Sequence, residues 1–126
     1  MLDFPRAARM LHASDFAATL KTRPLGRGQY LVLHYRRFDD NGRRPQLGMI
    51  VPKKNLKLSV ARNTVKRVLR ETFRTNQHQL PSGCYAFRLY RSLPDMSLTA
   101  MKALIRQECL LLLSKKINAK TRWPGS

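Results

Sequence analysis

Acidic side chains are scarce in this sequence, which limits the chemistry that the protein itself can perform. Only 7 of the 126 residues are Asp or Glu, at positions 3, 15, 39, 40, 71, 95 and 108. A hydrolytic enzyme needs clustered carboxylates or histidines to bind metal ions or to transfer protons. The two adjacent acids, Asp39 and Asp40, precede Asn41-Gly42 in a turn signal. The sequence therefore predicts neither a catalytic site nor a metal site in the protein.

Cysteines and long apolar runs are few as well. Cys84 and Cys109 have neither the C-x-x-C spacing of a zinc site nor the numbers of a disulfide framework. We expect both to be small buried side chains of a reducing cytosol. No apolar stretch approaches the roughly 20 residues that span a bilayer, and residues 1–16 lack the basic-then-apolar order of a secretory signal. The sequence predicts a cytoplasmic protein with no membrane partner.

Basic side chains are what the sequence has in excess. Lys and Arg total 25, which gives a formal net charge of +18. So large a charge opposes compaction unless a polyanion is the usual partner, so nucleic acid is favoured. A solvated cationic protein and a protein bound to an anionic membrane surface are the alternatives. The membrane alternative fails because the apolar side of the basic helix expected over 59–77 is needed for the core. The 43% hydrophobic content is enough for one core, so residues 1–126 are predicted to form a single RNA-binding domain with a flexible tail over 118–126.

Hydrophobic periodicity and turn signals predict the secondary structure. The expected elements are a helix over 15–21 capped by Ser14, a loop over 23–28, strands over 30–38 and 46–53, a helix over 59–77, a strand over 84–91 and a helix from Ser97 to about Ile117. The first two strands are expected to form a hairpin. The order helix, hairpin, helix, strand, helix indicates an α+β two-layer sandwich on a small mixed sheet, as in some ribosomal proteins. Its crossover is the basic helix.

The helix over 59–77 carries the main functional signal. Residues 53–74 contain eight basic side chains (53, 54, 57, 62, 66, 67, 70, 74) and one acid, Glu71. A single arc of about 140° on the helix holds six polar side chains, which we call the basic face: Arg62, Asn63, Lys66, Arg67, Arg70 and Arg74. Like charges four residues apart repel, so this pattern favours contacts with phosphates. A solvated face without a partner is the alternative.

A second group of residues offers contacts for unpaired bases. The rings of Phe16, Tyr30 and His34 can stack on bases, while Arg36, Lys54 and Arg91 can contact phosphates. Phe16 has a second interpretation as a core residue, and His34 as an ordinary residue of the sheet.

Three ordered motifs resemble the protein component of bacterial ribonuclease P. VARNTVKRVLRETFR resembles its signature of Arg-Asn-Arg, Lys-Arg and Arg-Glu-x-Phe-Arg. QLGMIVPKK resembles its Leu-Gly-x-x-Val-x-Lys-Lys strand, and FPRAARMLHASDF its Phe-Pro, Arg-Leu and Ser-x-Phe elements. Together the motifs cover most of residues 4–91 in the family's order, which makes the resemblance specific.

The resemblance implies an accessory subunit of an endoribonuclease that removes the 5′ leader from precursor tRNA. In this family the catalytic RNA and its Mg²⁺ ions perform the hydrolysis, with no small-molecule substrate. The signature helix docks on that RNA, which implies contacts from five residues: Arg62, Asn63, Lys66, Arg67 and Arg70. We expect Arg74, on the same basic face, and Lys53, in the basic segment before the helix, to contact the catalytic RNA as well. A cleft between the first helix and the sheet takes the leader, which implies contacts from these side chains: Phe16, Leu20, His34, Lys54 and Arg91.

The sequence departs from the family pattern at four positions. Thr64 replaces the second Arg of the signature, Ile50 and Pro52 replace small or hydroxyl residues, and Tyr90 stands where a basic residue is common. These departures concern affinity and leader preference. A ribosomal protein is the main rival interpretation, but it would not explain the ordered signature. A DNA-binding helix-turn-helix needs a short helix before the basic one, where this sequence predicts a strand.

Overall fold

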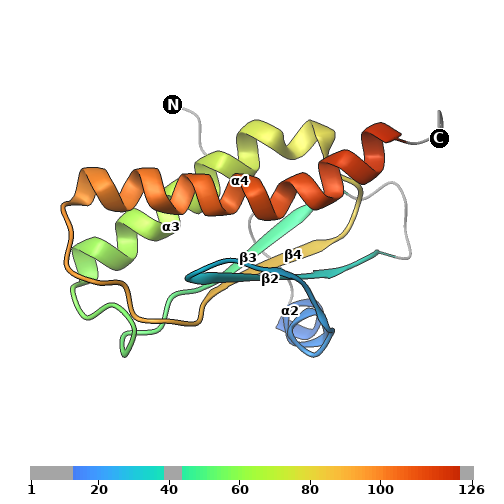
Figure 1. Cartoon of the computed structure of the whole chain (residues 1–126). Coiled ribbons are helices and arrows are strands. Elements are labelled where there is room, and N and C mark those ends of the chain that lie inside the picture. The colour runs from blue at the N-terminus through green and yellow to red at the C-terminus, as the bar shows by residue number, and fades with distance from the viewer. Residues whose placement is uncertain (1–12, 39–43, 123–126) are drawn as a thin grey trace.

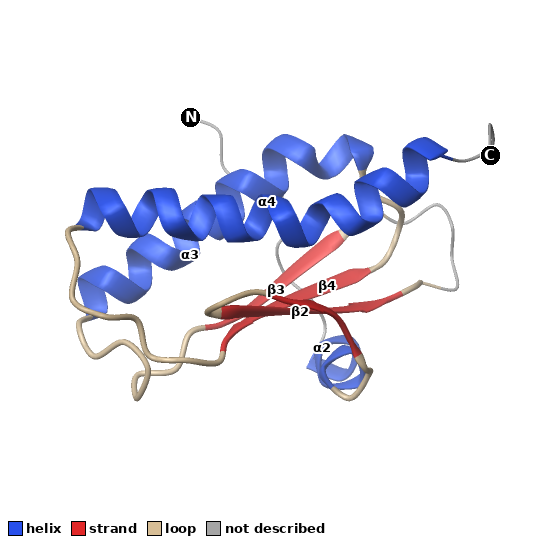
Figure 2. Ribbon diagram, viewed as in Figure 1, coloured by secondary structure: helices blue, strands red, loops and turns tan. Residues whose placement is uncertain are grey.

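The computed structural model describes residues 13–38 and 44–122, and the side chains of residues 14–38 and 44–116. Its elements are α2 (Ala13–Leu20), β1 (Pro24–Arg27), β2 (Leu31–Arg36), β3 (Gln46–Ile50), α3 (Ser59–Asn76), a 3-10 turn η1 (Gln77–Gln79), β4 (Cys84–Leu89) and α4 (Leu98–Arg122). The strands form one sheet in the order β1-β2-β4-β3 (Figures 1 and 2). The predicted α+β class, the small mixed sheet and the basic crossover helix are confirmed.

The position of β4 corrects the predicted hairpin. β4 lies between β2 and β3, antiparallel to β2 and parallel to β3, so residues 30–38 and 46–53 do not pair with each other. β4 is buried at every position except Arg88, and a strand covered on both faces belongs in the middle of a sheet. The Asn41-Gly42 turn signal, which falls outside the described residues, is local and could not reveal this pairing. The parallel pair β3–β4 is joined by α3, as such a pair requires.

The segment predicted as a loop over 23–28 contains an edge strand. Pro24 pairs with His34 and Arg27 with Val32, and the register shifts between Pro24 and Gly26. Proline has no N–H to donate, so strands tolerate it at an edge or near a bulge. Pro and Gly therefore marked an irregular edge strand here, and the prediction of a loop was wrong.

Two helix boundaries also differ from the prediction. α2 begins at Ala13, so Ser14 lies inside the helix rather than capping it, while Asp15 is in the first turn as expected. α4 continues to Arg122, past the expected end near Ile117, so residues 118–122 are helical and residues 123–126 lie outside the described chain. Ser97 caps α4 as predicted, because its hydroxyl accepts a hydrogen bond from the amide of Ala100 at 3.1 Å.

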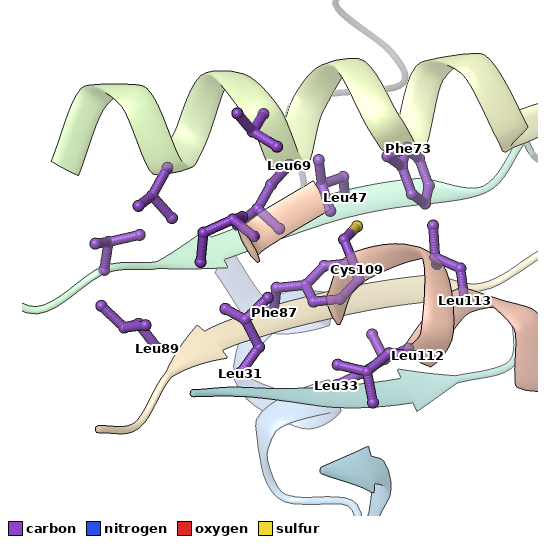
Figure 3. Close-up of a cluster of buried hydrophobic side chains, with 14 of the residues drawn as sticks. Leu31, Leu33, Leu47, Leu69, Phe73, Phe87, Leu89, Cys109, Leu112 and Leu113 are labelled. Atoms are coloured by element: carbon purple, nitrogen blue, oxygen red, sulfur yellow. The ribbon is translucent and has the colours of Figure 1, made fainter. Parts of the chain in front are cut away.

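The hydrophobic core lies between the sheet and the layer formed by α3 and α4 (Figure 3). Alternate strand residues point into it, and each helix contributes one apolar stripe. Fully buried members include Leu31, Leu33, Tyr85, Phe87, Leu89, Val65, Leu69, Phe73, Ile105, Cys109 and Leu113. Both cysteines are buried, as expected, and both are thiols. Burial raises the pKa of the Cys109 thiol, which keeps it protonated and inert.

The opposite face of the sheet is covered in part by α2, which packs against β2 and β4 (Figure 1). Thr19 of α2 is completely buried. The ion pair between Asp15 of α2 and Arg36 of β2, at 2.6 Å, holds the two elements together. The molecule therefore presents two polar regions, one on α3 and one beside α2. Within the described chain, no helix is long and apolar enough to cross a membrane.

Candidate nucleic-acid interface

The basic face of α3 is available to a partner because the other side of the helix is held in the core. Ala61, Thr64, Val65, Val68, Leu69, Thr72 and Phe73 are buried. Asn63 and Arg67 are exposed, and the other members of the basic face are partly exposed. The predicted division of α3 into a packed side and an exposed basic side is confirmed. Such a face can place several cations along a phosphate backbone.

Arg62 differs from its neighbours because part of its guanidinium is engaged within the protein. Its Nη1 donates hydrogen bonds to the carbonyl oxygens of Leu56, at 2.9 Å, and Lys57, at 2.7 Å. These bonds hold the loop before α3 against the first turn of the helix. Arg62 is therefore a structural clamp, with its remaining donors free to meet an anion.

Thr64 faces the packed side of α3. It is 7% exposed, and its hydroxyl donates a hydrogen bond to the carbonyl oxygen of Val60 at 2.8 Å. Its replacement of the family's arginine therefore affects the margin between the core and the basic face, and leaves the centre of that face unchanged.

Beside α2, His34 is more buried than an open stacking surface would be. Its ring is 5% exposed, and Nδ1 lies 3.0 Å from the carbonyl oxygen of Thr22. A carbonyl can only accept, so Nδ1 carries a proton and donates it in this hydrogen bond. Nε2 is buried and has no hydrogen-bond partner among the described residues. His34 thus forms part of the sheet beneath the end of α2, and its contact with the leader stays a prediction.

Phe16 and Leu20 are half-buried on α2. They are neither closed inside the core nor fully open to solvent, so both interpretations of Phe16 stay open. Arg36 carries a charge that Asp15 already neutralises. A phosphate would have to compete with that carboxylate for the guanidinium.

The remaining predicted residues lie on loops at the other end of the sheet. Lys53 and Lys54 are exposed in the β3–α3 loop, and Arg91 is exposed just after β4. The guanidinium of Arg91 lies 5.1 Å from the centre of the Tyr90 ring. Stacking on Tyr90 restrains this guanidinium while leaving its edge free for hydrogen bonds.

Two further arginines belong to this surface and were missed by the sequence analysis. The register places Arg27, Val32, Arg88 and Ile50 in one row across the four strands. Because neighbours in a register share a face and Phe87 and Leu89 point into the core, this row lies on the side of the sheet that α2 partly covers. Arg88 is exposed, and its alternation with the buried Phe87 and Leu89 was a usable signal.

Tyr90 organises this end of the sheet. Arg27 lies 5.4 Å from the centre of its ring, so the ring has two guanidinium neighbours, Arg27 and Arg91. The Tyr90 hydroxyl donates a hydrogen bond to the carbonyl oxygen of Gly28 at 2.6 Å, which ties β4 to the β1–β2 turn. At position 90, where the family commonly has a basic residue, this chain thus has a tyrosine whose ring contacts two arginines.

A third basic group lies near the end of α4. Lys116 Nζ is 4.0 Å from the centre of the Tyr35 ring, and burial together with the charge of Arg37 lowers the pKa of Lys116. Burial raises the pKa of Tyr35, whose hydroxyl donates to the carbonyl oxygen of Ser82 at 2.8 Å. Tyr35 is therefore a neutral structural residue.

Within residues 13–38 and 44–122, no three His, Cys, Asp or Glu side chains gather as they would around an ion. These residues therefore offer no Mg²⁺ site built from protein ligands alone. The arrangement of the described side chains is suited to binding a polyanion.

The sequence matches a known protein family over most of its length. A family model described as Ribonuclease P matches residues 4–116. The ribonuclease P protein component of Bordetella parapertussis is 40% identical over 107 residues, covering 82% of this chain and 87% of that protein. The ribonuclease P protein component of Paraburkholderia xenovorans is 32% identical over 124 residues, covering 94% of this chain and 87% of that protein.

Solved structures share the fold. The RNase P protein of Staphylococcus aureus matches with a TM-score of 0.69 and 21% identity, covering 88% of this chain and 98% of that one. The RNase P protein of Thermotoga maritima matches with a TM-score of 0.60 and 25% identity, covering 85% of this chain and 96% of that one.

Proposed function

Because this chain belongs to the ribonuclease P protein component family, we propose that it binds both the catalytic RNA and the 5′ leader of precursor tRNA in the bacterial cytoplasm. The catalytic RNA, with its Mg²⁺ ions, would perform the hydrolysis. The observation that carries this proposal is the basic face of α3, exposed beside a packed apolar side. In this proposal the protein contributes binding free energy and position, and the RNA contributes the chemistry.

The two polar regions would bind different RNAs. The basic face of α3 would lie along the catalytic RNA, with Arg67 and Arg70 at its centre and Lys53 at its margin. The surface beside α2 would take the single-stranded leader, with Phe16 stacking on a base and Arg91 contacting a phosphate. The exposed Arg88 and Arg27 add cations to that surface. Holding one RNA on each side would bring the leader and the catalytic RNA into a fixed relation.

The proposed assistance is electrostatic. Two RNAs repel each other through their phosphates, and divalent ions relieve that repulsion only when their concentration is high. A protein with a net charge of +18 can replace part of that counter-charge. The protein should therefore matter most where Mg²⁺ is scarce.

Reconstitution tests this function. The protein is added to the ribonuclease P RNA of the same bacterium, and precursor-tRNA cleavage is followed as Mg²⁺ is lowered. We expect the protein to restore cleavage at Mg²⁺ concentrations where the RNA alone is inactive, and to cleave nothing by itself. Cleavage by RNA-free protein, or no effect of the protein at any Mg²⁺ concentration, would contradict the proposal.

A further inference from the structure

A pocket of about 600 Å³ opens where the N-terminal ends of α3 and α4 lie together at one end of the molecule (Figure 1). Its walls come from the loop before α3, the first turn of α3 and the loop before α4. Five large apolar side chains are exposed in the described part of the chain, and three of them line this pocket: Leu58, Val60 and Leu98. The exposed apolar surface is therefore concentrated at one place.

Leu58 is poorly suited to its position in the helix. It is the N-cap residue of α3, and it makes no side-chain hydrogen bond to the first turn. Ser, Thr, Asp and Asn are favoured there because their side-chain oxygens accept a hydrogen bond from a first-turn amide, which leucine cannot do. Leu58 gains little burial in exchange, because it is 68% exposed. A leucine that neither caps its helix nor packs in the core indicates contact with a partner.

The rim of the pocket is mainly basic. Lys54 and Lys57 line it and are exposed, and Asp95 is the one acid among the lining residues. The uncapped amides of α3 and the absence of an acid from its first turn add to the positive potential. Arg62, clamped to the carbonyls of Leu56 and Lys57, fixes this loop against the start of the basic face. An apolar floor with a cationic rim matches a ligand with a flat apolar part and a phosphate.

We propose that this pocket receives one unpaired nucleotide of the RNA that lies along the basic face of α3, an inference that rests on the proposed function. The base would pack against Leu58, Val60 and Leu98, and its phosphate would lie at Lys57. The volume is within the range of small-ligand sites. The face of any base can pack on apolar side chains, so the contact tolerates different bases. The basic face starts at Arg62, one helical turn after Leu58. An RNA strand that lies along this face would therefore reach the pocket directly.

Leu58→Ser tests the proposal because it should affect the helix and the site in opposite directions. Serine caps α3, so the melting temperature of the free protein should hold or rise. Affinity for the ribonuclease P RNA should fall about tenfold, as expected when a base loses the apolar side chain that it packs against. One base that the original protein shields from base-directed chemical modification should become reactive. The salt dependence of binding should not change, because no charge is removed.

Leu111→Ser is the matched control. Leu111 is 62% exposed, similar to Leu58, but it lies on α4 and outside this pocket. We expect this variant to bind the RNA as the original protein does, with the same base shielded.

The outcomes separate this inference from the proposed function. Unchanged affinity and shielding for Leu58→Ser, while the original protein still binds the RNA, would overturn the nucleotide pocket alone. Failure of the original protein to bind the RNA would overturn the proposed function. Self-association of the free protein that Leu58→Ser abolishes, with RNA binding intact, would assign the pocket to a second copy of the chain and overturn the nucleotide.

Discussion

Arg62 and Arg67 carry the same charge on the same helix, but the structure gives them different tasks. Arg62 bonds two backbone carbonyls of the preceding loop, whereas Arg67 is exposed. Comparing these two arginines therefore distinguishes a contact to RNA from a contact within the protein. The sequence pattern assigned both to RNA, because it contains no information on the loop carbonyls that Arg62 reaches.

Substitution should reveal this difference. Arg67→Ala should weaken binding to the catalytic RNA by about 1–3 kcal/mol and leave folding stability unchanged, because one charge-assisted contact is lost. The slope of log affinity against log salt should become shallower by roughly one unit. Arg62→Ala should lower both RNA affinity and the melting temperature. Equal effects of the two variants on melting temperature would show that the Arg62 clamp has no energetic importance.

Phe16 is half-buried, so it can be either a base-stacking residue or a core residue. If it stacks on a leader base, Phe16→Ala should cost roughly 1–3 kcal/mol of affinity for precursor tRNA, with mature tRNA bound as before. Binding of both substrates to the reconstituted enzyme, together with thermal melts, measures this. Phe38→Ala is the control for a core phenylalanine, because Phe38 is 2% exposed. It should lose about 3–5 kcal/mol of folding stability. A Phe16 variant that behaves like the Phe38 variant would show that Phe16 is a core residue.

Among the elements, α3 could be predicted closely and the sheet only in part. The start of α3 at Ser59 and its two-sided pattern are local properties, repeated every turn of the helix. One of the two neighbours of β2 is not local: the pairing of Leu33 with Phe87 joins residues far apart in the sequence. Turn signals describe short connections, so they favoured a hairpin and missed the insertion of β4. The alternation within β4 predicts its core side, and the same alternation places Arg88 on the opposite, exposed side.

α4 is held to the sheet by a buried carboxylate that the sequence did not single out. Glu108 Oε1 accepts hydrogen bonds from the backbone amides of Tyr30, at 3.0 Å, and Leu31, at 3.1 Å. Glu108 is 7% exposed. These bonds fix the β1–β2 turn, including Gly28, whose carbonyl also accepts the Tyr90 hydroxyl. A glutamate in an apolar helix stripe gives no sign of which distant amides it meets.

Removal of this carboxylate should destabilise the fold. We expect Glu108→Ala to lower the free energy of unfolding by about 2–5 kcal/mol, because two backbone amides, one of them buried, lose their acceptor. Glu71→Ala is the control, since Glu71 is exposed on α3, and its effect should stay within about 0.5 kcal/mol. Chemical denaturation of both variants measures the difference. Equal stability of the two variants would mean that water replaces the carboxylate without cost.

For the whole molecule, the net charge of +18 sets opposite responses to salt in the free and bound states. Salt screens the repulsion among the protein's own cations, so the melting temperature of the free protein should rise by roughly a few degrees between 50 and 500 mM NaCl. Affinity for RNA should fall over the same range, because the counterions that binding releases gain less entropy when the surrounding salt is concentrated. A melting temperature that falls with added NaCl would contradict this account.

The central place of β4 has a consequence for how the chain is made. Synthesis runs from the N-terminus, so β2, β3 and α3 are all complete before Cys84–Leu89, the strand that joins β2 to β3, exists. Until then α3 has no finished sheet to pack on, and its like charges oppose an isolated helix. We expect a chain that stops at residue 83 to be largely unfolded by circular dichroism, and a chain that reaches residue 122 to be folded. The basic face is therefore synthesised before the strand that completes its sheet, and it takes shape only once those later residues have emerged from the ribosome.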